Sequence, residues 1–334
     1  TRTSTLFPYT TLFRSVSFSS VARGYFMGAQ HMGKIAISNF LRRAVQLILL
    51  VILFQWFDFS HELSILIALC TLIGSELIVL VYLITVYFLQ VQSIKKEPRE
   101  AMTGDIVRKQ LLAISIPTTG VRIFHAVTFA IKPFLIKAAL LQSGLSESVA
   151  LAQYGKLAGV AFTIGFFPAF IAHSLLIVLI PTVSEAYAKR DYVKLQNLLQ
   201  KVMLFTLAYG LTAVTIFYMY ADELTTLFFE SSRAAGYLQL LSLYFLFHYF
   251  VMPMQAYLIG LGLVKDAFLH AVWSTIVSFV LMFVLGSMEQ LQMEGVIIGM
   301  NTGVVLLTSM HYLTICKKIG ANILLRSPAN YRYY

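Results

Sequence analysis

The chain has 334 residues, of which 58% are hydrophobic and 12% are charged, and its formal net charge is +10. A water-soluble domain has about 25% charged residues, so the composition excludes a single soluble globule and indicates a polytopic membrane protein. The positive charge does not indicate nucleic-acid binding, because the basic residues lie in short loops between apolar segments. Cys70 and Cys316 lie inside apolar segments and predict neither a disulfide framework nor a metal site.

Residues 1–15 differ from the rest of the chain. Thr5–Ser15 reads TLFPYTTLFRS, which matches the in-frame translation of a common sequencing adapter. We therefore expect residues 1–15 to be an artefact outside the fold, and the natural protein to be longer than this chain.

Eight apolar segments follow, each long enough to cross a bilayer as a helix of about 20 residues. They cover residues 37–57, 63–90, 111–138, 157–183, 201–221, 236–259, 267–287 and 294–316. The predicted fold is an all-α membrane bundle. Loops rich in lysine and arginine alternate with neutral or acidic loops; the basic ones are 23–43, 91–110, 184–201, 260–266 and the tail after 316. This alternation predicts that both ends of the chain are cytosolic.

The span 111–138 carries an unusual cationic stripe. At about 100° per residue, Arg122, His125, Phe129 and Lys132 share one helix face. A charge facing lipid at mid-depth costs at least about 2.5–3.5 kcal/mol, so the stripe should face a watery cavity or a partner. Arg122 could bind phosphate oxygens with its planar guanidinium, and Lys132 is too deep to reach the interface easily.

Other charged groups in the spans have more than one interpretation. His125 could donate to a substrate or pack as a neutral ring. Lys137, near the outer end of its span, is expected to extend to the interface. Glu76, in the middle of the span 63–90, could bind a coupling proton or sodium ion, or form an ion pair with Arg122 or Lys132.

Five stretches carry a family resemblance. They are RGYFMGAQHM (23–32), IPTTGVR (116–122), QYGKLAG (153–159), IPTVSEAYAKRD (180–191) and ADELTTLFFESSRAAG (221–236). Together they resemble the stage V sporulation protein B family, in the polysaccharide-transporter branch of the multidrug/oligosaccharidyl-lipid/polysaccharide (MOP) flippase superfamily. The resemblance implies a two-lobe transporter of about fourteen helices. Residues 16–110 would hold the last two spans of the N-terminal lobe and the inter-lobe loop. The C-terminal lobe would occupy residues 111–318, and a cytosolic tail residues 319–334.

The resemblance also implies a function. Such a protein would move a lipid-linked cell-wall precursor of the undecaprenyl-pyrophosphate type, used for spore cortex peptidoglycan, across the plasma membrane by alternating access. Its partners would be that lipid-linked oligosaccharide, membrane lipids and cell-wall synthesis proteins. Arg122 follows the PTTG of the family motif directly. The chain departs from the family near Lys132, where relatives have an acidic residue, and at Lys156, a position that is commonly acidic, so the exact substrate stays open.

The sequence leaves other functions open. A cation-coupled multidrug antiporter of the same superfamily would need acidic cavity residues, and a non-transporting scaffold for cell-wall synthesis would not need charges inside the membrane. A membrane glycosyl transferase would need an acidic pair, for which Glu289 and Glu294 are the candidates. The chain contains no zincin, P-loop, dinucleotide-binding or nucleophile-elbow motif, so we predict a transporter without catalytic residues, metal or cofactor.

Overall fold

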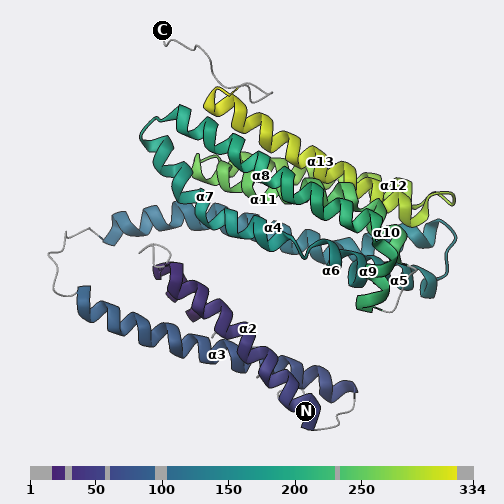
Figure 1. Cartoon of the computed structure of the whole chain (residues 1–334), viewed down its shortest axis with the longest axis horizontal. Coiled ribbons are helices and arrows are strands. Elements are labelled where there is room, and N and C mark those ends of the chain that lie inside the picture. Colours follow the sequence, from purple (N-terminus) through teal and green to yellow (C-terminus); the bar gives the residue numbers. More distant parts are fainter. Residues whose placement is uncertain (1–16, 27–31, 57–60, 95–103, 230–233, 322–334) are drawn as a thin grey trace. The chain divides into compact units, whose positions relative to one another are not determined.

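The computed structural model describes residues 17–26, 32–56, 61–94, 104–229 and 234–321 (Figure 1). The predictions for residues 1–15 and for most of the tail lie outside these ranges. The described residues form helices and the turns between them, with no β-strand among them, as the all-α prediction requires. The chain divides into two compact units, Thr1–Met102 and Thr103–Tyr334.

The first unit consists of a helical segment at residues 17–26, α2 (Met32–Trp56) and α3 (His61–Ile94). α2 and α3 pack against each other. Near the start of α2 and the end of α3, Lys34 Nζ donates to Gln90 Oε1 at 2.7 Å, so the two helices run antiparallel. Phe26, Val79 and Leu83 are fully buried and form a small core between the 17–26 segment and α3.

The second unit contains the remaining helices. They are α4 (Gly104–Gln142), α5 (Glu147–Gly155), the π-helix η1 (Lys156–Ala161), α6 (Phe162–Gly165), α7 (Ala169–Ala188), α8 (Tyr192–Met219), α9 (Ala221–Phe229), α10 (Ala235–Leu240), α11 (Ser242–Gly260), α12 (Val264–Gly286) and α13 (Gln292–Ile319). α11 packs against α7, α8 and α13, while α12 lies along α13 and also contacts α4.

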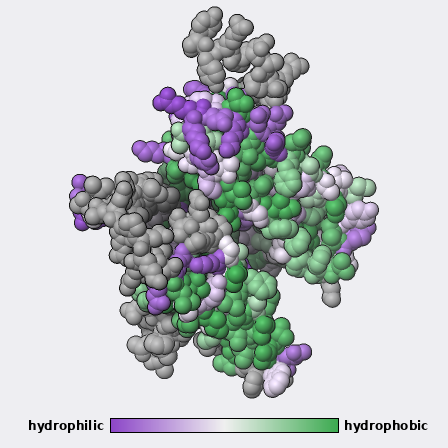
Figure 2. Space-filling model, turned by 60° about the vertical axis from the view of Figure 1, so that its left-hand side comes forward, coloured by the Kyte–Doolittle hydropathy of each residue, from purple (hydrophilic) through white to green (hydrophobic). Residues whose placement is uncertain are grey.

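The chain is a multi-pass membrane protein. Seven of the described helices are long and apolar enough to cross a bilayer: 33–56, 67–90, 119–142, 169–188, 192–219, 264–286 and 292–319. Large apolar side chains remain exposed along them, such as Phe134 at 73% and Trp273 at 57%, as expected for surfaces that face lipid. Hydrophobic side chains accordingly cover much of the coloured surface in Figure 2.

The sixth predicted span, residues 236–259, corresponds to α10 and α11, which are separated at Leu241. The backbone hydrogen bonds continue through this point, since Leu241 N donates to Tyr237 O and Phe245 N donates to Leu241 O, both at 2.9 Å. The carbonyl of Leu240 accepts from Asn301 Nδ2 of α13 at 3.1 Å. The segment therefore remains one helical path with a local irregularity that α13 contacts.

The predicted span 157–183 is not one continuous helix. η1 and α6 occupy its first part, Phe166–Pro168 forms a turn, and α7 begins at Ala169. Proline has no backbone N–H and cannot continue the hydrogen bonding of a preceding helix, so Pro168 is a natural end of this turn. The spanning part is α7, which ends five residues beyond the predicted position, at Ala188 rather than 183.

Two buried tyrosines join α11 to its neighbours. Tyr249 Oη donates to the carbonyl of Gly165 in α6 at 2.5 Å, and Tyr257 Oη donates to the carbonyl of Leu195 in α8 at 2.8 Å. Buried hydroxyl groups need such partners, because an unpaired polar group in an apolar interior is costly. These bonds fix α11 as a central element of the second unit.

α12 and α13 approach each other closely along a row of glycines. A Cβ atom at Gly299 would lie 2.4 Å from Met282 N, and one at Gly295 would lie 2.3 Å from the carbonyl oxygen of Leu285. A Cβ at Gly303 would lie 2.5 Å from Ser278 Cβ. Only glycine allows this backbone contact, which is a common way of packing helices within a membrane.

Candidate functional site

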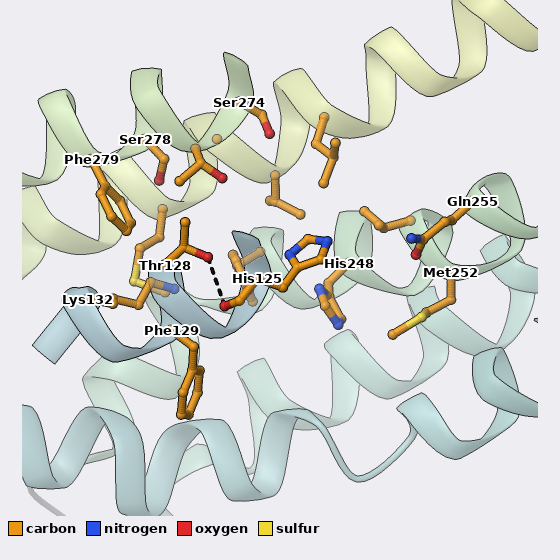
Figure 3. Close-up of a pocket in the computed structure, with 17 residues that line it drawn as sticks. His125, Thr128, Phe129, Lys132, His248, Met252, Gln255, Ser274, Ser278 and Phe279 are labelled. Atoms are coloured by element: carbon orange, nitrogen blue, oxygen red, sulfur yellow. Dashed lines mark hydrogen bonds between the residues drawn. The ribbon is translucent and has the colours of Figure 1, made fainter. Parts of the chain in front are cut away.

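A cavity of about 460 Å³ lies within the second unit, bounded by α4, α11, α12 and α13 (Figure 3). Its walls combine apolar side chains with hydroxyl, amide, imidazole and ammonium groups. The lining residues are His125, Thr128, Phe129, Lys132, Tyr244, His248, Val251, Met252, Gln255, Ser274, Thr275, Ser278, Phe279, Met300, Gly303, Val304 and Leu307. A cavity of this size with a few polar groups is typical of a ligand site.

α4 supplies the basic wall. Successive turns of one face of this helix contribute His125, Thr128, Phe129 and Lys132 to the cavity wall. The structure therefore brings His125 and Lys132 of the predicted stripe to one cavity. Arg122, one turn earlier on α4, is exposed and is not among the described lining residues.

Lys132 is the charged side chain of the cavity wall. Its Nζ lies 5.8 Å from the centre of the Phe162 ring, a cation–π contact with α6. The ammonium group has three donors and no acceptor, and no described lining residue is an aspartate or glutamate. A cation held in a carboxylate-free apolar cavity favours an anionic ligand.

His248 of α11 also lines the cavity, although it is not among the site residues predicted from the sequence. Its ring stacks on Tyr244, with centres 5.6 Å apart and planes at 15°, and meets Phe166 edge-on at 4.9 Å. Tyr244, His248 and Gln255 place polar groups on one side of an otherwise apolar helix. Their spacing of four and then seven residues, one and two helical turns, was a signal in the sequence that could have indicated this wall.

Hydroxyl groups of the cavity wall donate to the backbone. Thr128 Oγ1 donates to the carbonyl of His125 at 3.0 Å, as Figure 3 shows, and Ser278 Oγ donates to the carbonyl of Gly299 at 3.0 Å. Ser274 Oγ donates to the carbonyl of Ala271 at 3.1 Å. With these three protons used, the remaining donors of the wall are Lys132, the imidazoles, Gln255 and the hydroxyl groups of Tyr244 and Thr275.

Glu76 lies in a separate, buried charged cluster of the first unit. Its side chain is 3% exposed; Oε1 accepts from Ser19 Oγ at 2.5 Å and lies 3.2 Å from Arg23 Nη2. Arg42 Nη1 lies 3.9 Å from Oε2. Two guanidinium groups beside one carboxylate oppose the binding of a further cation, so this geometry favours the ion-pair role over a coupling-ion site. Sequence reasoning did not name Arg23 or Arg42 as partners.

Lys137 also has a partner. It forms an ion pair with Glu147, which joins the end of α4 to the start of α5, instead of simply extending to the interface as predicted. The Lys137 ammonium group holds the pKa of the Glu147 carboxyl below its usual value, through a hydrogen bond and its charge. Both side chains are solvent-accessible, so the pair orders the loop more than it stabilises the fold.

The chain is similar in sequence to two sporulation proteins of Bacillus subtilis. It is 54% identical to sporulation protein YkvU over 310 residues, which are 93% of this chain and 70% of that protein. It is 30% identical to stage V sporulation protein B over 317 residues, which are 94% of this chain and 61% of that protein. The chain thus spans about two thirds of the curated relatives it matches. No family model matches the chain.

The fold is similar to that of solved transporters. An outward-facing multidrug resistance MATE family transporter of the MOP superfamily matches with a TM-score of 0.73 and 16% identity, over 94% of this chain and 68% of that one. A MOP superfamily transporter from Pyrococcus furiosus, described as having a binding pocket of reverse polarity, matches with a TM-score of 0.70 and 16% identity, over 92% and 67%. At these identities the likeness establishes the fold.

Proposed function

The chain belongs to the family of sporulation protein YkvU and stage V sporulation protein B, and we propose that it is the larger part of a flippase that carries a lipid-linked cell-wall oligosaccharide precursor across the cytoplasmic membrane. The proposed head group is a pyrophosphate of the undecaprenyl type, and the product would serve spore cortex peptidoglycan. The family membership supports the role in sporulation, and the MATE-like fold supports transport.

The observation that carries the proposal is the charge of the cavity. Lys132 contributes a cation at mid-span, His125 and His248 add imidazole donors, and the described lining residues include no carboxylate. Such a cavity favours the pyrophosphate head group of a lipid carrier over a cationic drug.

The proposed mechanism divides the ligand between two environments. The pyrophosphate would bind Lys132 and His125 in the cavity, while the polyprenyl tail stays in lipid. Arg122 is exposed one turn before His125, and in this proposal it first captures the head group bidentately. Alternating movement of two lobes would then expose the cavity to each side of the membrane. The alternating loop charges support a cytosolic location for both ends of the chain.

A cation-coupled multidrug antiporter is the second candidate, because MATE transporters share the fold. A cavity for cationic drugs would be expected to present carboxylates. The described cavity has the opposite charge, and the Pyrococcus furiosus protein with its pocket of reverse polarity provides a precedent for this fold.

Transport in liposomes distinguishes the two candidates. The full-length protein, of which this chain is the larger part, would be reconstituted with a fluorescent lipid-pyrophosphate oligosaccharide, and the fraction accessible to a membrane-impermeant quencher would be followed over time. In parallel, cationic dyes would be tested with proton and sodium gradients. We expect movement of the lipid and no gradient-driven dye export; dye export without lipid movement would replace the flippase by the antiporter.

A further inference from the structure

Two histidines form a buried pair between α12 and α13, outside the cavity wall. His270 Nδ1 and His311 Nδ1 are 2.9 Å apart. His270 is 8% exposed and His311 is 2% exposed. His270 Nε2 also lies 3.3 Å from Thr314 Oγ1. A nitrogen–nitrogen distance of 2.9 Å requires one proton between the two rings, because two bare nitrogens or two N–H groups would repel each other.

The pair lies at the end of the glycine row that joins α12 to α13. Gly299 faces Met282 and Gly303 faces Ser278, so each step of four residues along α13 matches a step of four back along α12. Continuing the same register by two steps brings His311 to His270. The intermediate step contains Leu307 and Ser274, which both line the cavity. The histidine pair is therefore one helical turn from the cavity wall.

Several charged and titratable groups lie on α12 and α13 themselves and on α4, α8 and α11, which pack against these two helices. They are Lys265 and Asp266 on α12; Glu294, Tyr312, Cys316, Lys317 and Lys318 on α13; Tyr244, His248, Tyr249 and Tyr257 on α11; Asp105, Arg108, Lys109, Arg122, His125, Lys132 and Lys137 on α4; and Tyr192, Lys194, Lys201, Tyr209 and Tyr218 on α8. Asp266, one turn before His270, is a carboxylate whose charge acts on that imidazole. Tyr249 and Tyr257 are already bonded to backbone carbonyls.

This arrangement can accept one proton without losing its hydrogen bond. When His270 is the Nδ1–H donor, its Nε2 is bare and faces the Thr314 hydroxyl group. A proton from hydronium can bind the Nε2 lone pair, while the electron pair of the broken O–H bond returns to water. The Thr314 hydroxyl then turns to accept from the new N–H. A second proton would place two positive rings together and disrupt the pair.

We propose that His270 and His311 form a single proton-binding site that takes up one proton as a unit and is linked to the occupancy of the neighbouring cavity. Proton binding by the pair stands independently of what the cavity transports. Its link to ligand binding rests on the proposed function, because that link needs an anionic ligand in the cavity. A proton gained one turn from Ser274 and Leu307 would favour an anion there by its charge.

Histidine NMR titration of the purified chain in detergent tests proton binding directly. Wild-type protein labelled with ¹⁵N-histidine is titrated, with signals assigned by His270→Gln and His311→Gln. We expect the pair to bind protons in two steps more than about one pH unit apart, and the remaining histidine of either variant to titrate in a single step. The proposal would be overturned if His270 and His311 titrated independently over the same pH range in the wild type, and if neither variant changed the titration of the remaining histidine. If one variant does not fold, the other variant assigns the signals and the wild-type titration decides the question.

Binding of farnesyl pyrophosphate across the same pH range tests the link. We expect His311→Gln to flatten the pH dependence of the dissociation constant, and the control His61→Gln, at the start of α3 in the first unit, to leave it as in the wild type. An unchanged pH profile in His311→Gln would overturn the link. Absence of binding by the wild type at every pH would instead count against the proposed function, and the NMR titration would still decide proton binding.

Discussion

At the residue scale, the residues of the cationic stripe differ in their surroundings because they lie at different points along α4. His125 and Lys132 line the cavity, whereas Arg122 lies before it and is exposed. A lysine within a span is tolerated where it meets an aromatic ring and a cavity, and both are present at Lys132. We therefore expect Lys132, rather than Arg122, to contribute most to ligand binding in the cavity.

Neutralising Lys132 should impair transport more than moving its charge. Lys132→Met removes the ammonium donor and should slow lipid movement at least about tenfold, since losing a hydrogen bond to a charged group costs about 1.5–3 kcal/mol. Lys132→Arg keeps the charge and should retain more of the rate. Flipping rates in liposomes, at matched amounts of reconstituted protein, make the comparison. Equal rates for Lys132→Met and the wild type would remove Lys132 from the site.

Removing the charge of Glu76 should destabilise the first unit. Glu76→Gln would leave Arg23 and Arg42 beside each other without a counter-charge. We expect a loss of about 2–4 kcal/mol, below the value for a fully buried pair because the arginine side chains keep 19% and 35% exposure. Thermal unfolding in detergent would show a lowered midpoint. Glu185→Gln, which breaks an exposed pair with Lys189, should leave the midpoint unchanged.

The sequence could predict which residues share a face of one helix, but not which residues meet between helices. Helical periodicity was enough to group His125 with Lys132. The partners Arg23, Arg42 and Glu76, and likewise His270 and His311, come from different helices. Their contacts depend on helix register and crossing, which no local pattern in the sequence specifies. Arg122 and Lys132 were proposed as partners for Glu76 because only their charge and depth could be compared.

At the element scale, hydropathy predicted the spans but not their interruptions. A window of about 19 residues averages over a single turn, so the break at Phe166–Pro168 and the irregularity at Leu241 left no trace in the apolar pattern. Both irregular points have contacts to other helices: the Gly165 carbonyl binds Tyr249, and the Leu240 carbonyl binds Asn301. Tertiary hydrogen bonds thus satisfy the backbone where the helices deviate.

The contact of α12 with α13 should be sensitive to a single methyl group. A Cβ at Gly299 would lie 2.4 Å from a backbone nitrogen, which cannot move aside as a side chain can. We expect Gly299→Ala to cost about 1–3 kcal/mol through overpacking and to lower the unfolding midpoint. Gly236→Ala is the matched control, since a Cβ there has nothing within 4 Å. A stable Gly299→Ala protein would mean that α12 and α13 are less tightly packed than described.

At the scale of the whole molecule, the loop charges predict the direction in which the chain crosses the membrane. Lysine and arginine are concentrated in alternate loops, and the intervening loops contain residues such as Glu147 and Asp222. The structure supplies helices long enough to cross the membrane, and the charge pattern supplies their proposed orientation.

Cysteine labelling in intact cells tests this orientation. In a background with Cys70 and Cys316 replaced by serine, Glu147→Cys should react with a membrane-impermeant thiol reagent added outside, because its loop is predicted to face outward. Asn197→Cys on α8, near the basic 184–201 loop, should react only after the cells are opened. Reaction of both from outside, or the reverse pattern, would overturn the predicted sidedness.

The proposed function depends most on anion binding by the cavity of the second unit. The direct measurement is the affinity of the purified protein for two amphiphiles with the same farnesyl chain, one ending in pyrophosphate and one in trimethylammonium, at fixed pH and salt. We expect the pyrophosphate to bind at least about tenfold more tightly, and Lys132→Met to abolish this preference. Tighter binding of the trimethylammonium compound, or a preference that survives Lys132→Met, would contradict this expectation.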